Sequence, residues 1–317
     1  MASENTVPGL AQTLGVEAGA TVLHEDLAAA ALSDGDIRTL RRRGELERIF
    51  RGAYRLPSGP VYSDARYLAT VLAFADTRRH VSDPPVIAGP AAVVLHGLPL
   101  LGAPPRLVHV ARAYPGGRSA RGLGIPVGEV PADQLATVAG TATVRAARAA
   151  LDTARLMTLE AGVVAADAAL RRGLTSTDEL RAVVDTLKGC RGIERARRCV
   201  ELADGASESP GESWSAVVLD RLGIIRPERQ QEFFDSSGLI GRSDFWWPDQ
   251  QTVGEFDGRV KYGRANPTGR APEDVLWSEK VREDRLRGIG LSIVRWTTPD
   301  LQHPHSLANR LKAALAR

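Results

Sequence analysis

The feature that most constrains the fold is a pair of short apolar runs between residues 244 and 257, which carry three carboxylates. Residues 244–247 and 252–257 have the aromatic and β-branched content of paired strands, with a Pro-Asp turn between them. Glu255 and Asp257 are two residues apart, so a strand directs both side chains to the same face. We therefore predict a β-hairpin that displays acids on one face.

Crowded carboxylates need a counter-charge. Asp244, Glu255 and Asp257 would repel one another on one sheet face unless a cation lies among them. Their oxygen atoms, with no Cys or His nearby in the sequence, favour Mg²⁺ or Mn²⁺. The hairpin thus predicts a divalent metal site. The alternative is that these acids are solvated surface groups.

The flanking segments predict further elements in a fixed order. A helix opens near Gly211 and ends near Gly223, and a strand follows at residues 230–235. After the hairpin, Pro272 starts a second helix, and residues 291–296 form a last strand. The predicted order is α-β-β-β-α-β.

This order, with Asp244 on one strand and a Glu-x-Asp motif on the next, resembles the PD-(D/E)xK nuclease superfamily. It is most similar to small domains related to very-short-patch repair endonucleases, over about residues 208–312. Asp257 stands where the superfamily has a lysine, and Lys261 or Lys280 would replace that group. The resemblance implies a catalytic set of Glu212, Asp244, Glu255, Asp257, Lys261 and Lys280, with Mg or Mn held by Asp244, Glu255 and Asp257.

Two arginines of the second helix, Arg282 and Arg285, are three positions apart and so share a helix face. Arginines in such a position contact DNA phosphates in many complexes. The alternative is a solvated face on which they pair with Glu279 and Glu283. The sequence leaves both interpretations open.

A second basic segment lies near the N-terminus. Ser33 or Asp34 can cap a helix that ends at Gly44, and residues 46–56 alternate as a hairpin would. Between residues 38 and 55 there are seven arginines and two glutamates, although the whole chain carries a net charge of only +3. A helix followed by a basic hairpin predicts a winged helix-turn-helix. The predicted DNA-binding residues are Arg38, Arg41, Arg42, Arg48, Arg51, Arg282 and Arg285.

The run GELERIFRGAYRLP, together with residues 87–98, resembles AbiEi-like antitoxins of type IV toxin-antitoxin systems. That resemblance implies a protein that binds DNA and represses its own operon. It also implies a cognate toxin as a partner.

Length and composition predict an α/β multidomain chain. With 317 residues it can hold a winged helix at 1–60, a mixed α/β domain at 61–203 and the nuclease-like domain at 204–317. The Gly/Ser-rich run 204–211 is the predicted linker. Helices are predicted at 144–157 and 159–170.

Neither cysteine usage nor hydropathy adds a site. Cys190 and Cys199 have no pattern of a disulfide or a metal centre. No apolar run approaches membrane-spanning length, so we expect a cytoplasmic protein without a membrane partner. Two functions remain: a DNA-binding protein with a metal-dependent endonuclease domain, or an AbiEi-like antitoxin and repressor whose nuclease-like domain is inactive.

Overall fold

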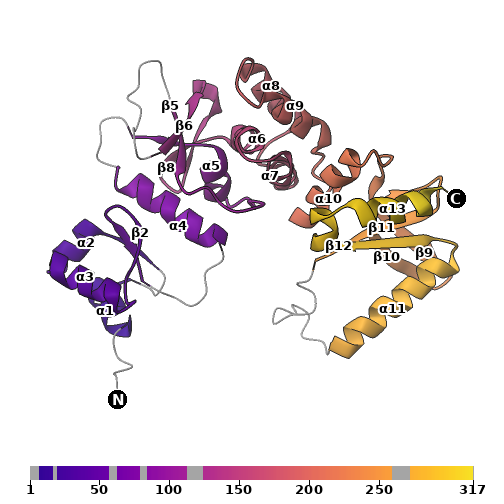
Figure 1. Ribbon diagram of the computed structural model, residues 1–317, viewed down its shortest axis with the longest axis horizontal. Coiled ribbons are helices and arrows are strands. Elements are labelled where there is room, and N and C mark those ends of the chain that lie inside the picture. Colours follow the sequence, from indigo (N-terminus) through magenta and orange to yellow (C-terminus); the bar gives the residue numbers. More distant parts are fainter. Residues whose placement is uncertain are drawn as a thin grey trace.

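The computed structural model describes residues 7–16, 20–56, 63–78, 84–112, 124–258 and 272–316. These residues form a mixed α/β structure with three sheets, of three, five and four strands. Figure 1 shows the N-terminal elements at one end, the five-stranded sheet and its helices in the middle, and the four-stranded sheet at the other end. None of the described helices is long and apolar enough to cross a membrane.

The N-terminal region packs three helices against a small antiparallel sheet of strand order β1-β3-β2. Its elements are α1 (Val7–Leu14), β1 (Thr21–Leu23), α2 (His24–Ala29), α3 (Asp34–Arg42), β2 (Glu47–Phe50) and β3 (Ala53–Arg55). Ser33 caps α3, because its Oγ accepts from the Asp36 backbone N–H at 3.2 Å and the Asp36 carboxylate accepts from the Ser33 N–H at 2.9 Å. The predicted basic helix and hairpin are confirmed. The sequence interpretation had included neither α1 nor β1.

Helix α4 (Ser63–Asp76) packs against the β2–β3 hairpin. The rings of Phe50 and Phe74 meet edge to face at a centroid distance of 5.6 Å, and the Arg78 guanidinium lies 4.1 Å from the Phe74 ring centroid. On the same hairpin, Arg66 forms an ion pair with Glu47. The hairpin is therefore held on the side that faces the middle of the molecule.

The middle region is a five-stranded mixed sheet of order β6-β5-β4-β8-β7, covered by alanine-rich helices. Its elements are β4 (Val86–Ile87), α5 (Gly89–Leu95), β5 (Val108–Arg112), β6 (Gly124–Glu129), the 3-10 helix η1 (Ala132–Gln134), β7 (Leu135–Val138), β8 (Thr141–Val144), α6 (Ala146–Leu156), α7 (Leu159–Arg171), α8 (Thr177–Thr186) and α9 (Ile193–Leu202). Helices α6 and α7 approach closely, because a Cβ at Gly162 would lie 2.3 Å from the Ala154 Cβ. Both predicted helices are confirmed, although α6 begins after β8.

The C-terminal region has the predicted order of elements. They are α10 (Pro210–Arg221), β9 (Glu228–Asp235), β10 (Gly238–Trp247), β11 (Thr252–Asp257), α11 (Pro272–Gly288), β12 (Ser292–Thr297), α12 (Thr298–Gln302) and α13 (His305–Leu315). Strands β9, β10 and β11 are antiparallel neighbours, and β12 runs parallel to β11. One sheet face buries Phe245, Trp247 and Trp296, and the other buries Trp246 and Val253 with Leu286 of α11.

The predicted linker at residues 204–211 is a packed junction and not a loose connection. The Asp167 Oδ1 atom accepts from the backbone N–H groups of Asp204 and Gly205 at 2.9 and 3.0 Å, and its Oδ2 accepts from the Ser207 hydroxyl at 3.0 Å. Ser207 also accepts from Arg229 of β9 at 2.7 Å. Composition predicted a turn-rich segment correctly, but the buried acid that orders it lies on α7.

Candidate functional site

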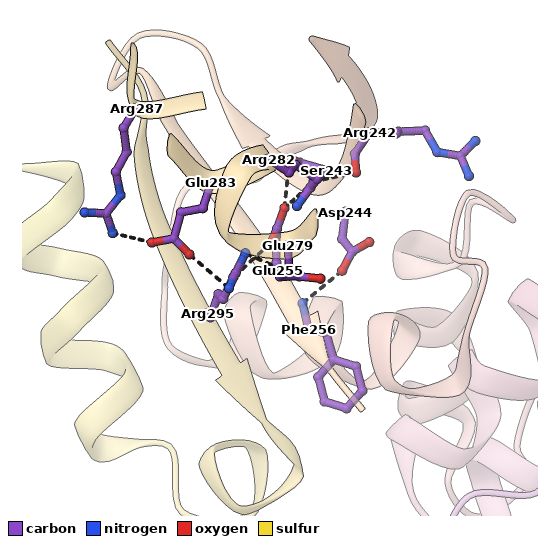
Figure 2. Close-up of polar contacts among 10 residues, drawn as sticks. All are labelled: Arg242, Ser243, Asp244, Glu255, Phe256, Glu279, Arg282, Glu283, Arg287 and Arg295. Carbon is purple, nitrogen blue, oxygen red and sulfur yellow. Dashed lines mark hydrogen bonds and ion pairs between the residues drawn. The ribbon is translucent and has the colours of Figure 1, made fainter. Parts of the chain in front are cut away.

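The predicted acidic site is organised around Glu255, which is 9% exposed in the middle of β11. Its Oε1 accepts from Arg282 Nη2 at 2.6 Å and from the Ser243 hydroxyl at 3.2 Å, and its Oε2 accepts from Arg295 Nε at 3.1 Å. Figure 2 shows these groups converging from α11, β10 and β12. Burial alone would raise the pKa of Glu255, but the hydrogen bond and charge of Arg282, with Arg295, outweigh burial and hold it below its ordinary value of 4.5.

Arg295 extends this arrangement into a charge network. Its guanidinium reaches Glu279 at 3.0 Å and Glu283 at 3.0 Å, both on α11, in addition to Glu255. Arg287 pairs with Glu283 at 2.6 Å, one helical turn along α11. The network therefore joins β11, β12 and α11 through alternating charges (Figure 2).

Asp244 and its neighbour Ser243 direct their side chains to different partners. The Asp244 Oδ2 atom accepts from the backbone N–H of Phe256 at 2.9 Å, whereas the Ser243 hydroxyl reaches Glu255. Figure 2 shows the Asp244 carboxylate turned toward that backbone N–H. In the pairing of β9 with β10, Gln231 lies opposite Ser243 and Arg229 opposite Phe245, so Gln230 lies opposite Asp244.

Glu212 belongs to the same neighbourhood through Gln230. Its Oε2 accepts from Gln230 Nε2 at 2.7 Å and from the Glu208 N–H at 2.9 Å, and its Oε1 accepts from the Ser209 hydroxyl at 2.7 Å. Glu212 is 6% exposed, and Gln230 has a φ of 55°. A non-glycine residue with positive φ inside a strand stores strain, which is common near functional sites. Two of these hydrogen bonds, from the Glu208 N–H and the Ser209 hydroxyl, close the first turn of α10, and this capping is an equally direct reason for the carboxylate.

The other residues of the predicted catalytic set are Asp257, Lys280 and Lys261. Asp257 ends β11, and its Oδ1 is buried without a hydrogen bond from the described residues. Lys280 is exposed on α11. Lys261 lies outside the described residues.

The residues fit a metal ion poorly in this arrangement. The prediction rested on acids without compensating charge, and this premise is wrong for Glu255, because two guanidinium groups occupy its carboxylate oxygens. The described residues contain no group of three His, Cys, Asp or Glu placed to hold a metal. Asp257 has a buried oxygen, Oδ1, that accepts no hydrogen bond from the described residues. Binding of Mg²⁺ or Mn²⁺ stays a prediction and would require Arg282 and Arg295 to release Glu255.

The two predicted DNA-binding arginines of α11 are engaged within the protein. Arg282 bonds Glu255 and the Arg242 carbonyl, and Arg285 makes two bonds of 2.7 Å to Asp235. The hydrogen bond from Arg285 holds the pKa of Asp235 down at about 2. The paired interpretation of this helix therefore describes its contacts, although the partners of these two arginines are Glu255 and Asp235 instead of Glu279 and Glu283.

The five predicted arginines of the N-terminal region have a different environment. All five are exposed, and none has a carboxylate partner among the described residues: Arg38, Arg41, Arg42, Arg48 and Arg51. Arg42 donates to the Thr39 hydroxyl at 3.2 Å, and Arg48 donates to the Phe50 carbonyl at 3.3 Å. Arg55, in contrast, is buried and lies 3.9 Å from Glu47. Helix α3 and the hairpin thus form a basic surface whose charge is not neutralised locally.

Sequence reasoning missed two groups of the acidic site, Ser243 and Arg295. Arg295 sits in the apolar strand β12, and a lone charged residue in such a strand was the available signal, since a buried charge requires a partner. Ser243 gave no signal of its own. Its position beside Asp244 was visible, but the sequence did not show that the Ser243 hydroxyl contacts Glu255.

The comparisons with known proteins concern the N-terminal region most directly. Residues 22–57, which include α2, α3 and the β2–β3 hairpin, match the family model described as "Transcriptional regulator, AbiEi antitoxin". This match supports a DNA-binding regulatory role. Two relatives from Mycobacterium tuberculosis, Uncharacterized protein MT2308 (strain CDC 1551 / Oshkosh) and Uncharacterized protein Rv2248 (strain ATCC 25618 / H37Rv), are each 29% identical over 204 residues, which cover 64% of this chain and 72% of each relative.

Proposed function

We propose that this chain is a DNA-binding regulator of the AbiEi antitoxin type, with α3 and the β2–β3 hairpin acting as a winged helix-turn-helix. The observation that carries the proposal is a set of five exposed arginines that have no carboxylate partner among the residues described, all inside the matched segment 22–57. An unpaired guanidinium is available to a phosphate without first breaking an internal ion pair. Helix α3 would lie in the major groove, with Arg48 and Arg51 of the hairpin on the backbone beside it.

Salt dependence tests the proposal directly. We expect replacement of Arg41, Arg42 and Arg51 by Ala to weaken binding to operator-containing duplex DNA. Each lost phosphate contact should lower the steepness of log K against log salt by about 0.9, hence by about 2.7 for all three. The measurement is fluorescence anisotropy across a salt series, on duplexes from the region upstream of the gene.

A matched control variant removes the same charge elsewhere. Arg181, Lys188 and Arg197 are surface residues of α8, α9 and their connection, and each pairs with a neighbouring acid. Their replacement by Ala should leave the salt slope unchanged. Equal loss of slope in both triple variants would show that only the total charge matters and would remove the α3 surface from the proposal.

A cognate toxin is part of the same proposal. Support for it comes from the AbiEi match at residues 22–57. A neighbouring reading frame that encodes a nucleotidyltransferase-like toxin, and co-purification of its product with the full chain, would support this partner. A toxin that is neither neutralised nor bound by the full chain would restrict the proposal to transcriptional regulation.

A second candidate function is metal-dependent cleavage of DNA by the C-terminal region. The observations that favour it are the α-β-β-β-α-β order and the Asp257 Oδ1 atom, which is buried without a described donor. The test is nicking of supercoiled plasmid in Mn²⁺ by wild type and by Asp244→Ala and Lys261→Ala variants. Nicking that persists in both variants, or no nicking by wild type, would exclude this candidate.

A further inference from the structure

A cavity of about 380 Å³ in the middle region is lined, among the described residues, by arginines and apolar side chains. Its lining residues are Val127, Arg155, Leu156, Arg191 and Arg195. They come from β6, the last turn of α6, the α8–α9 connection and the first turn of α9. No residue of this region was assigned a function by the sequence, and the cavity lies apart from both surfaces described above.

The positions of two of these arginines are fixed by hydrogen bonds to the backbone. Arg155 is 5% exposed and donates from Nε to the Arg191 carbonyl at 3.1 Å. Arg195 donates from Nη1 to the Met157 carbonyl at 2.7 Å and also contacts the Arg155 carbonyl. These contacts close the end of α6 and leave further N–H groups on both guanidiniums without an acceptor in the described part of the chain.

The α8–α9 connection holds the third arginine, Arg191, at the same place. Gly192 has a φ of 81°, and a Cβ at this position would lie 2.8 Å from the Arg155 carbonyl oxygen. Glycine is therefore required for the connection to approach α6 so closely. The Arg191 side chain is exposed and has no hydrogen bond or ion pair to the described residues.

Charge at this cavity is strongly unbalanced. Within the part of the chain that the structure describes, the carboxylate bonded to this group is Asp152, which pairs with Arg155 and also with Arg148 at 2.8 Å. Arg191 and Arg195 have no carboxylate partner among the described residues. Concave sites lined by one sign of charge concentrate the electrostatic field and attract ligands of opposite charge.

Two other cavities lined by three arginines have those charges paired. In a cavity of about 680 Å³ beside β12 and α13, Arg287, Arg295 and Arg310 pair with Glu283, Glu255 and Asp300. The cavity of about 410 Å³ between α9, α10 and β9 is also lined by three arginines, but three acids line it as well. Arg198 there pairs with Asp220, and Arg226 lies 3.7 Å from Asp204. Because its arginines are paired with acids, that cavity does not require an anion to balance their charge.

We propose that Arg155, Arg191 and Arg195 form a binding site for a small phosphorylated molecule of nucleotide size. Guanidinium groups match phosphate oxygens in geometry and charge. Val127 and Leu156 supply the apolar wall that a base or other ring requires, and the volume falls in the range of small-molecule sites, about 300–1,000 Å³. A concave pocket with an apolar wall suits a compact ligand better than the convex backbone of duplex DNA.

Calorimetric titration of the full chain with ATP, AMP and inorganic phosphate tests this site. We expect saturable binding of ATP by wild type and a loss of about tenfold or more in affinity for Arg191→Ala, since one charge-assisted contact corresponds to at least that factor. The Arg191 side chain supports no described contact, so the thermal midpoint of this variant should stay at that of wild type. Lys188→Ala removes an exposed charge three residues away and should bind ATP as wild type does.

Each alternative result overturns a defined part of the proposal. Absence of saturable binding for all three probes, or equal affinity in wild type and Arg191→Ala, removes the site. Equal weakening by Lys188→Ala shows a general charge effect and also removes it. Inorganic phosphate that binds as tightly as ATP removes the nucleotide and leaves an anion site. Weaker duplex binding by Arg191→Ala without ATP binding identifies DNA backbone phosphate as the ligand and overturns the small-molecule assignment.

Discussion

Arginines of the N-terminal and C-terminal regions were both predicted to bind DNA, but the structure places them in different environments. The five predicted arginines on α3 and the β2–β3 hairpin are exposed, and the structure describes no carboxylate partner for them. Arg282 and Arg285 of α11 each bind a carboxylate, Glu255 or Asp235, at 2.6–2.7 Å. Residue type and spacing are thus insufficient to predict phosphate binding, because neighbouring acids determine whether a guanidinium is available.

The difference has an energetic basis. A phosphate that approaches Arg282 must compete with the carboxylate of Glu255. This carboxylate is 9% exposed and would lose one of its partners. Leaving a buried charge without its partner costs several kcal/mol, whereas an exposed arginine exchanges only water and counterions for a phosphate. The α11 arginines are therefore suited to holding the sheet and helix together, and the α3 arginines to binding a partner.

The largest effect that would test this contrast is on the free energy of unfolding. We expect Arg295→Ala to lower the free energy of unfolding of the C-terminal region by about 2–3 kcal/mol, because Glu255, Glu279 and Glu283 all lose one cation. Arg41→Ala, in contrast, should change it by less than about 0.5 kcal/mol. Urea unfolding monitored by tryptophan fluorescence measures the first variant, since all five tryptophans lie in the C-terminal region. Equal midpoints for wild type and Arg295→Ala would contradict a structural role for the network.

Acid should weaken the C-terminal network through Glu255. Its pKa is below 4.5 in the folded protein, so its ionised form contributes stability above that pH, and this contribution is lost as the pH falls through the folded value. Glu255→Gln should be less stable than wild type by about 1–2 kcal/mol at neutral pH. This gap between the two free energies of unfolding should narrow below pH 4.5. A gap that stays constant from pH 7 to 3 would show that the carboxylate charge is not what the two arginines stabilise.

Local sequence patterns were sufficient to predict the elements but not the partners. Strand alternation and the helix signals at Pro272 and Ser33 gave the C-terminal order and the position of α3. The acidic hairpin was also predicted correctly, with Phe245 opposite Gly254. These features depend on neighbours within a few residues, which is the range over which periodicity and capping act.

Long-range contacts account for what the sequence did not reveal. Arg295 reaches Glu255 across 40 residues, and Asp167 orders the 204–211 segment from a similar separation, 37–40 residues. Nothing in a local window tells which distant charge compensates an acid. The predicted metal site assumed that no such cation existed, and the linker was predicted from the composition of residues 204–211 alone.

A smaller effect should come from the cap of α3, which supports the basic surface. Ser33→Ala removes the hydroxyl that accepts from the Asp36 N–H and should cost about 1 kcal/mol. If α3 presents its arginines to DNA, the same change should weaken duplex binding slightly without changing the salt slope, because no phosphate contact is lost. Ser33→Thr retains a capping hydroxyl and serves as the control. A changed slope in Ser33→Ala would indicate that α3 itself is displaced.

The smallest effect on DNA binding is expected for Arg285, whose surroundings contrast most clearly with those of Arg41. Arg285 is an arginine on an exposed helix, like Arg41, yet its two bonds to Asp235 and its contacts with the Gly238 and Leu239 carbonyls occupy it within the protein. Arg285→Ala should therefore leave both duplex affinity and the salt slope unchanged, whereas Arg41→Ala should reduce the slope by about 0.9. Both substitutions remove one positive charge, so a nonspecific effect of net charge would change the two variants equally. A reduced slope for Arg285→Ala would mean that the Asp235 pair opens on DNA, and that an internal carboxylate does not by itself exclude a guanidinium from phosphate binding.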